Sequence, residues 1–457
     1  MESTCSSAIS IEVKESLKQL RIHFIHVGNM RNKGVQALLR SDVQAILHLL
    51  KTGVRFSVST CDVPGTKRYF PDIEHVLPQL VDIPYEKADS YARLRGLKRK
   101  DVRYRIALAV YFSIMPVQIL LSIMSAVLIK VRLKPFYRAD VLRQMKDSDL
   151  VVSYSDENFK DSLFLLPSNV YWYLTWWSML LSRTWDVLVA SYLGRRVVMF
   201  PNSVGPFNTH IGRLLSRLAL RRYSCILVRD SISYEMVNKL GRTCPVISTS
   251  DTSLLYDELH VRELVSHGRL IGVVPGFYSD VLSADRVTQY LTAHAEALDF
   301  VLEKYAFDAV FLSNYVSGFA NDDLDVCRRI ISRMKNKDRV KVVNVDTFEE
   351  FKKILGRCSL VVSSRMHSSV AAVLEEVPTV CIAYDQKQIG FFQQLELTEC
   401  LVSMSELSTE GLLKKIIEVH ENTEELVRKM AHKIPLLQQN VRQAIEKTLR
   451  ANLEYNS

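Results

Sequence analysis

Two basic side chains, Arg365 and His367, stand one residue apart in a polar corner of the sequence, and Lys387 follows in the same stretch. Guanidinium, imidazole and ammonium groups that converge on one spot are suited to a phosphate or a carboxylate. Imidazole also accepts or delivers a proton near neutral pH. The corner, which contains Ser364 and Met366 as well, therefore predicts an anion site with acid–base capacity.

The elements around this corner are typical of a βαβ unit. An apolar run precedes it, residues 368–376 have a helical pattern, and residues 379–383 form a second apolar run. In such a unit the corner at the carboxyl end of the strand faces the ligand crevice. The first backbone N–H groups of the helix, here those after Met366, also suit an anion. We therefore expect Arg365 and His367 to face a ligand.

Strand and helix patterns alternate over much of the chain, which predicts an α/β fold with parallel sheets. A first series starts with a strand, a glycine-bearing loop and a helix between residues 21 and 50, and a second starts after a polar linker at 257–268. Residues 62–88 look irregular. The strands expected are 21–27, 56–60, 150–153, 196–200, 225–228, 245–247, 271–274, 308–312 and 340–345, and the helices of the second series are 284–305, 322–334 and 348–355.

The two series predict two Rossmann-like domains that face each other across a cleft. The N-terminal domain is expected at 1–258, with an apolar helical insertion at about 93–143, and the C-terminal domain at 259–400. Residues 401–457 read as helices, and we expect them to pack back on the first domain.

Composition narrows the class of protein. A chain of 457 residues, 48% hydrophobic and 24% charged, is long enough for two cores and is typical of a globular protein. Its eight cysteines are scattered singly, without a CxxC pair, which argues for reduced thiols and against a disulfide framework or a zinc site. The first twenty residues lack an apolar core, so no signal peptide is expected.

An uncharged, mostly apolar run at 106–129 lies between the basic segments 93–105 and 130–143. Pro116 interrupts it, and positive charge on both sides suits a segment that dips into one leaflet and returns to the cytoplasmic face. A buried helical hairpin and a true membrane span are the alternatives. The tryptophan-rich stretch 171–185 belongs either to the core or to the same interface.

A nucleic-acid binder is disfavoured, because the basic residues flank an apolar run instead of alternating with aromatic residues.

Several motifs, in order along the chain, resemble the polysaccharide pyruvyl transferase family. The combination of Ser-Arg-Met-His at 364–367 and Tyr-Asp-x-Lys at 384–387 is similar to the C-terminal signature of that family. This chain departs from the family at 153–155, where a glycine-rich turn is replaced by Ser-Tyr-Ser before Asp156. The other similar segments are Gly28-Asn29, Asn32-Lys33-Gly34, Asn202 to Phe207, Val228 to Ser233, and Asp251.

The resemblance implies a GT-B-like fold and transfer of a pyruvyl group from phosphoenolpyruvate to two hydroxyls of a sugar, which forms a cyclic ketal. Arg365 and Arg229 are the candidates to bind the doubly anionic donor, and His367 is the candidate acid or base. Asp156 is expected to take the hydroxyl proton or to orient the acceptor. Asn32 and Lys387 are further ligand candidates. No metal and no cofactor besides the donor are expected.

Two other functions fit parts of the sequence. A nucleotide-sugar-dependent glycosyltransferase of the same architecture would use the basic corner on a diphosphate, although no acidic pair spaced to hold a ribose is evident. A non-catalytic membrane-associated scaffold would instead use the segment 93–143. If the apolar run contacts a membrane, a peripheral or monotopic location at its inner face and a lipid-linked or membrane-proximal glycan acceptor are expected.

Overall fold

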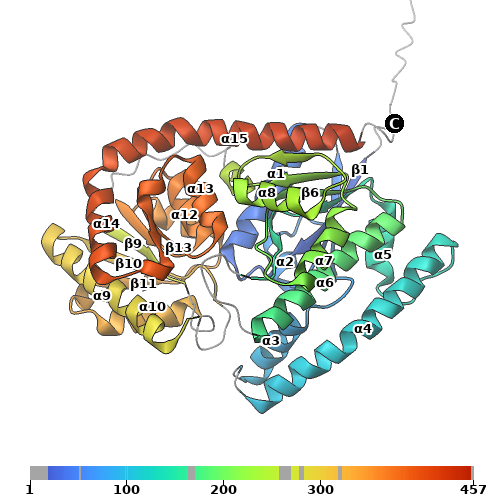
Figure 1. Ribbon diagram of the computed structural model, residues 1–457, viewed down its shortest axis with the longest axis horizontal. Coiled ribbons are helices and arrows are strands. Elements are labelled where there is room, and N and C mark those ends of the chain that lie inside the picture. Colours follow the sequence, from blue (N-terminus) through green and yellow to red (C-terminus); the bar gives the residue numbers. More distant parts are fainter. Residues whose placement is uncertain are drawn as a thin grey trace, which may run out of the picture.

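The computed structural model describes residues 19–50, 53–97, 99, 101–162, 170–256, 269–276, 282–316 and 322–453. Two separate parallel sheets organise them (Figure 1). The predicted linker at 257–268 and the boundary at 258 lie outside the described residues. The first sheet has the order β3-β2-β1-β4-β6-β7-β8, with β5 paired to β6. Its strands are β1 (Leu20–Val27), β2 (Val54–Thr60), β3 (His75–Pro78), β4 (Leu150–Ser153), β5 (Asp156–Phe159), β6 (Val197–Val204), β7 (Cys225–Val228) and β8 (Val246–Ser248).

The central strands of the first sheet are buried on both faces, because side chains alternate between two cores. On β1, Phe24 lies in one core and Ile25 in the other. The core of Phe24 is covered by α1 and by the end of α15 (Thr423–Leu453). The core of Ile25 is covered by α5, α6, α7 and the C-terminal part of α4. The helices of this half are α1 (Lys33–Leu50), α2 (Val63–Tyr69), α3 (Pro84–Arg95), α4 (Val102–Lys130), α5 (Ala139–Asp147), α6 (Val170–Tyr192), α7 (His210–Leu220) and α8 (Ser231–Leu240).

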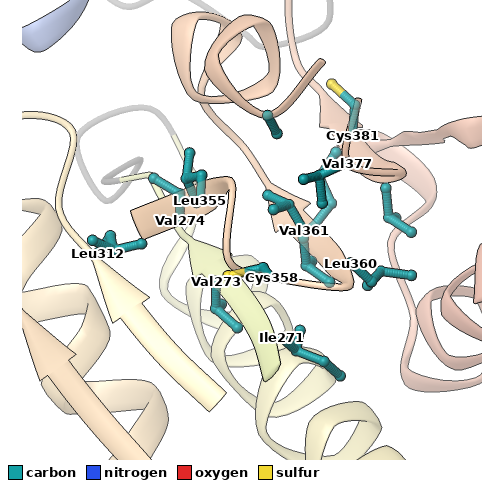
Figure 2. Packing of buried hydrophobic residues seen from close by; sticks show 14 of the residues in the cluster. Ile271, Val273, Val274, Leu312, Leu355, Cys358, Leu360, Val361, Val377 and Cys381 are labelled. Carbon is teal, nitrogen blue, oxygen red and sulfur yellow. The ribbon is translucent and has the colours of Figure 1, made fainter. Parts of the chain in front are cut away.

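The second sheet is also parallel and has the order β11-β10-β9-β12-β13-β14. Its core combines aliphatic and aromatic side chains, and Figure 2 shows Ile271 and Val273 of β9 beside Leu360 and Val361 of β12. The strands are β9 (Leu270–Val274), β10 (Asp308–Leu312), β11 (Val340–Val343), β12 (Leu360–Ser363), β13 (Thr379–Ala383) and β14 (Leu401–Ser403). The helices are α9 (Ala284–Tyr305), α10 (Asp323–Arg333), α11 (Phe348–Leu355), α12 (Met366–Leu374), α13 (Gln386–Gln394), α14 (Thr409–Glu421) and α15 (Thr423–Leu453).

The C-terminal helices contact both halves. In α14, Leu412 and Ile416 belong to the core of the second sheet. The long helix α15 starts on that core with Met430, crosses between the halves, and ends on the first-sheet core with Ile445 and Leu449 (Figure 1). One helix thus ties the two sheets together on the side away from α4.

Residues 62–88 are not irregular as expected, because they form α2, β3 and the start of α3. The side chain of Asp62 accepts a hydrogen bond from the N–H of Gly65 and so begins α2, which has only seven residues. A helix or strand this short does not fill the window of about 11–18 residues in which a period can be recognised, which is why the pattern was missed.

The apolar segment is one continuous helix, α4, so the expected dip-and-return path and the alternative hairpin are both wrong. Pro116 removes a single N–H donor and the helix continues through it. Among the described residues α4 is the one helix long and apolar enough to cross a membrane, with a mean hydropathy of 2.2, but only 28% of its most apolar window is buried. It is therefore not a core helix either.

Candidate active site

The predicted corner forms as expected at the end of β12. The strand stops at Ser363, Arg365 keeps an extended backbone, and α12 begins at Met366. Every side chain of α12 is buried, and α12 contacts α1 of the other half. His367 therefore sits in the first turn of a helix at the junction of the two halves, where free backbone N–H groups face the same region.

Gly34 of α1 lies against the ring of His367. A methyl group at Gly34 would come within 2.2 Å of Nδ1 and 2.7 Å of Cγ of the imidazole, so glycine is needed for this approach. The other ring nitrogen, Nε2, lies 3.9 Å from Oδ2 of Asp251 and has no hydrogen-bond partner among the described residues. Burial lowers the pKa of His367 to about 4, although the carboxylate of Asp251 opposes this. The imidazole is therefore neutral at neutral pH.

Arg229 and Asp251 form a buried ion pair beside His367. Nη1 of Arg229 lies 2.6 Å from Oδ2 of Asp251, and its Nε donates to Oγ of Ser203 at 3.0 Å. The third nitrogen, Nη2, is buried without a hydrogen-bond partner among the described residues. Burial alone would lower the pKa of Arg229, but Asp251 and other carboxylates raise it. One carboxylate oxygen thus lies close to both an arginine and a histidine, which come from different sheets.

Asp156 opens β5, next to the same group of charges. Its Oδ2 accepts a hydrogen bond of 2.5 Å from the hydroxyl of Tyr154, the residue that stands in the expected glycine-rich turn. Burial and the neighbouring Asp156 raise the pKa of Tyr154 well above its usual range. The charge of Asp156 acts on the imidazole of His367, which places the two side chains in one electrostatic environment.

Lys387 belongs to a buried ionic network that joins the two halves. Oε2 of Glu157 accepts from Nζ of Lys387 at 2.8 Å and from Nζ of Lys160 at 2.6 Å, and Lys160 also contacts Oδ2 of Asp385 at 2.9 Å. Burial alone would raise the pKa of Glu157, but the two ammonium groups hold it well below its usual range. The charge of Lys387 is thus largely balanced by Glu157.

A comparison with known proteins decides the family. The sequence model described as Polysaccharide pyruvyl transferase matches residues 67–386, which is most of the chain. This chain belongs to the polysaccharide pyruvyl transferase family. The match includes Asp156, Arg229, Arg365 and His367 but ends just before Lys387.

One curated relative of this pyruvyl transferase family member is the amylovoran biosynthesis protein AmsJ of Erwinia amylovora. The two are 25% identical over 263 residues, which cover 54% of this chain and 63% of AmsJ. The chain therefore matches less than two thirds of the length of that relative.

Solved structures show the fold of this chain. The UDP-GlcNAc 2-epimerase of Neisseria meningitidis, bound to UDP-GlcNAc, superposes on this chain with a TM-score of 0.56 at 10% identity. The superposition covers 94% of this chain and 99% of the epimerase chain. A Listeria monocytogenes protein assigned as a UDP-N-acetylglucosamine 2-epimerase gives 0.57 at 12% identity, with coverage of 96% and 97%. Together with the two parallel sheets, these likenesses confirm the predicted pair of Rossmann-like domains in a GT-B-like fold.

The structure brings some of the predicted site residues together more closely than others. The charges of Arg229, Asp156 and Lys387 all act on the imidazole of His367. Arg365 is instead held by Asp323 of α10, to which its Nε donates at 3.1 Å and its Nη2 makes a second bond. Its side chain remains 20% exposed.

Three other candidates have structural partners in the described part of the chain. The hydroxyl of Ser364 contacts that of Tyr290 at 2.8 Å, and the side chain of Met366 lies in the core. Asn32 forms an isolated β-bridge with Tyr315, and its Oδ1 accepts from Nδ2 of Asn314 at 3.1 Å. Asn32 therefore links the loop after β1 to the loop after β10.

Sequence reasoning gave no role to Asp251, Gly34 or Glu157, although each contacts a predicted site residue. Asp251 and Gly34 stood in the segments that resemble the family, so those segments were the available signal. Glu157 follows Asp156 directly, but nothing local in the sequence shows that it reaches Lys387.

Proposed function

We propose that this chain transfers a pyruvyl group from phosphoenolpyruvate to two hydroxyls of a sugar in a polysaccharide or glycan precursor, forming a pyruvate ketal. The observation that carries the proposal is the pair of buried nitrogens, Nη2 of Arg229 and Nε2 of His367, beside Oδ2 of Asp251. A buried polar group without a partner costs about 1–3 kcal/mol. This cost supports a polar ligand that engages both nitrogens.

The donor carries a phosphate and a carboxylate, and the site has a separate group for each. Nη2 of Arg229 engages one anion from the first half, and the first N–H groups of α12 engage the other from the second half. Arg365 stands directly before α12, and Asp323 fixes the plane of its guanidinium while largely balancing its charge, so Arg365 contributes an oriented donor without a large loss of side-chain entropy.

The reaction requires three proton transfers. The first sugar hydroxyl adds to C2 of the enol, its proton leaves to a base, and a proton reaches C3 to make the methyl group. The second hydroxyl then displaces phosphate from C2, and its proton leaves with the phosphate. Neutral His367 is ready to accept a proton, and a bound phosphate would raise its pKa and so favour delivery. Asp156 acts on the acceptor hydroxyl, with its carboxylate oriented by Tyr154.

We also propose that the acceptor is a lipid-linked or membrane-proximal glycan and that the chain contacts the inner face of a membrane through residues 106–129. The small buried share of α4 supports this contact. Full recovery of the protein in the soluble fraction at low salt, without detergent, would count against it.

Isotope transfer tests the donor. Protein is incubated with membrane-derived glycan acceptors and either phosphoenolpyruvate labelled at C3 or labelled UDP-sugars. We expect label from phosphoenolpyruvate to enter acid-labile ketals with equimolar phosphate release, and we expect His367→Gln to abolish it. The variant Glu446→Gln, on the exposed surface of α15, is the matched control. Label from a UDP-sugar in the glycan, with none from phosphoenolpyruvate, would establish the glycosyltransferase alternative.

A further inference from the structure

The outer side of α4 is apolar, which is the reverse of a surface helix on a soluble domain. Its inner side carries apolar residues such as Ala126 and Ile129 and also polar residues that bond to the protein body. Gln118 makes two hydrogen bonds with Asp82, at 2.9 and 3.0 Å. Oγ of Ser122 accepts from Nε1 of Trp185 at 2.7 Å, and Oγ of Ser125 accepts from a backbone N–H at 3.0 Å. The large side chains that point outward from α4 are Val102, Ile106, Val110, Ile114, Val117, Leu120, Ile123, Met124 and Val127.

Two more helices extend this apolar surface. Residues of α4, α6 and α7 share the core under one face of the first sheet, so their outer sides face away from that same sheet face. Successive residues of α6 contact the two neighbours: Oγ1 of Thr184 donates to the carbonyl of Leu215 in α7, and Trp185 donates to Ser122 in α4. α6 therefore lies between α4 and α7. The exposed apolar side chains on α6 and α7 are Leu174, Tyr192, Ile211, Leu214 and Leu218.

The charges around this surface are basic. The stretches 102–138 and 210–222 contain no acidic residue, and α6 contains only Asp186, which is buried. Exposed arginines and lysines stand at both ends of α4 and at the end of α7. These residues are Arg103, Arg105, Lys130, Arg132, Lys134, Arg217, Arg221 and Arg222.

We propose that the outer sides of α4, α6 and α7 form one docking surface for an anionic lipid bilayer, with α4 lying in the plane of the membrane. Apolar side chains would enter the acyl boundary while the basic ends contact lipid phosphates. A spanning orientation would separate Gln118 and Ser122 from their partners on the protein body, so the in-plane orientation follows. Figure 1 shows α4 along the outer edge of the first half, far from α15.

This inference rests on the proposed membrane contact through 106–129 and adds α6, α7 and the lipid charge to it. It is independent of the donor chemistry. The docking surface also favours a lipid-linked glycan as the acceptor, because an enzyme held flat on a bilayer meets such amphiphilic glycans at high local concentration.

Vesicle flotation of the full-length chain tests the surface. The probes are phosphatidylcholine vesicles with and without phosphatidylglycerol, at low and high salt. We expect binding only with phosphatidylglycerol, and loss of binding at high salt. Leu120→Glu on α4 and Leu214→Glu on α7 should each weaken the partition coefficient by about tenfold or more. Leu436→Glu, at a similarly exposed leucine of α15, should bind as wild type. Thermal unfolding verifies that every variant is folded.

Each possible result supports or refutes one part of the proposal. If Leu214→Glu binds as wild type while Leu120→Glu does not, the three-helix surface is refuted but contact through α4 stands. If the wild type does not bind anionic vesicles, or forms a dimer that Leu120→Glu dissociates, the lipid assignment is refuted. Phosphoenolpyruvate binding, measured on the same proteins without vesicles, should be unchanged in these variants. Its absence in the wild type would refute the donor proposal and leave the docking surface untouched.

Discussion

The contact between Gly34 and His367 gives a specific prediction. The two residues belong to different halves, and they can approach this closely because Gly34 has no side-chain carbon. Gly34 stands at the start of α1, where alanine would ordinarily stabilise a helix by about 0.5–1 kcal/mol. Here the added carbon would lie 2.2 Å from Nδ1 of His367. The imidazole must move, and overpacking of this kind costs about 1–3 kcal/mol. We therefore expect Gly34→Ala to lower the free energy of unfolding.

A double-mutant cycle separates this clash from a general effect on the helix. In His367→Ala the ring is gone, so adding Gly34→Ala should cost little or stabilise the protein slightly. The coupling free energy between the two positions should then be about 1–3 kcal/mol. Gly53→Ala is the control, since its new carbon would meet nothing closer than 3.6 Å.

The assays are urea unfolding and phosphoenolpyruvate titration. A displacement of His367 by about 1 Å is enough to lower catalysis about 100-fold, so Gly34→Ala should also weaken donor binding and turnover. Wild-type stability and wild-type donor affinity in Gly34→Ala would refute the placement of His367 against α1, and with it the meeting of the two halves at this residue.

Other predictions concern charge. Glu157→Gln leaves Lys387 and the buried Lys160 without their shared carboxylate, so it should lower the free energy of unfolding by about 3 kcal/mol, whereas Glu446→Gln should not change it measurably. Equal stability of both variants by urea unfolding would show that the network contributes nothing. Burial lowers the pKa of His367 from 6.5 to about 4, so the unfolded chain takes up this proton first, and stability present above pH 6.5 is lost as the pH falls towards 4. The wild type should lose about 3 kcal/mol more than His367→Gln across this window, and identical pH profiles would contradict the buried, neutral imidazole.

Local patterns predicted the strands and helices well where they were long. The corner from Ser364 to His367 formed as expected, because an apolar run, a polar turn and a small-residue helix leave few alternatives. The path of α4 was wrong, because a run that is apolar on nearly all sides has no clear period. Its polar positions Gln118, Ser122 and Ser125 have helical spacing, and only the structure shows what they contact.

The cross-sheet contacts could not be predicted from the sequence. Asp251 and Gly34 lie far from His367 along the chain, and their approach depends on how the two sheets are packed. The same holds for Arg365, whose partner Asp323 comes from another helix of the second half. A sequence shows which residues end strands, whereas the distances between strands of different sheets are set by the whole fold.

The central claim is that Arg229 and His367, from opposite sheets, hold one doubly anionic donor. Calorimetric titration of phosphoenolpyruvate tests it most directly, with the wild type, Arg229→Lys and His367→Gln. Lysine keeps a charge for Asp251 but lacks the guanidinium fork. We predict saturable binding to the wild type and at least about tenfold weaker binding to each variant, since one charge-assisted hydrogen bond contributes about 1.5–3 kcal/mol. Wild-type affinity in both variants, or no heat of binding in the wild type, would contradict the account.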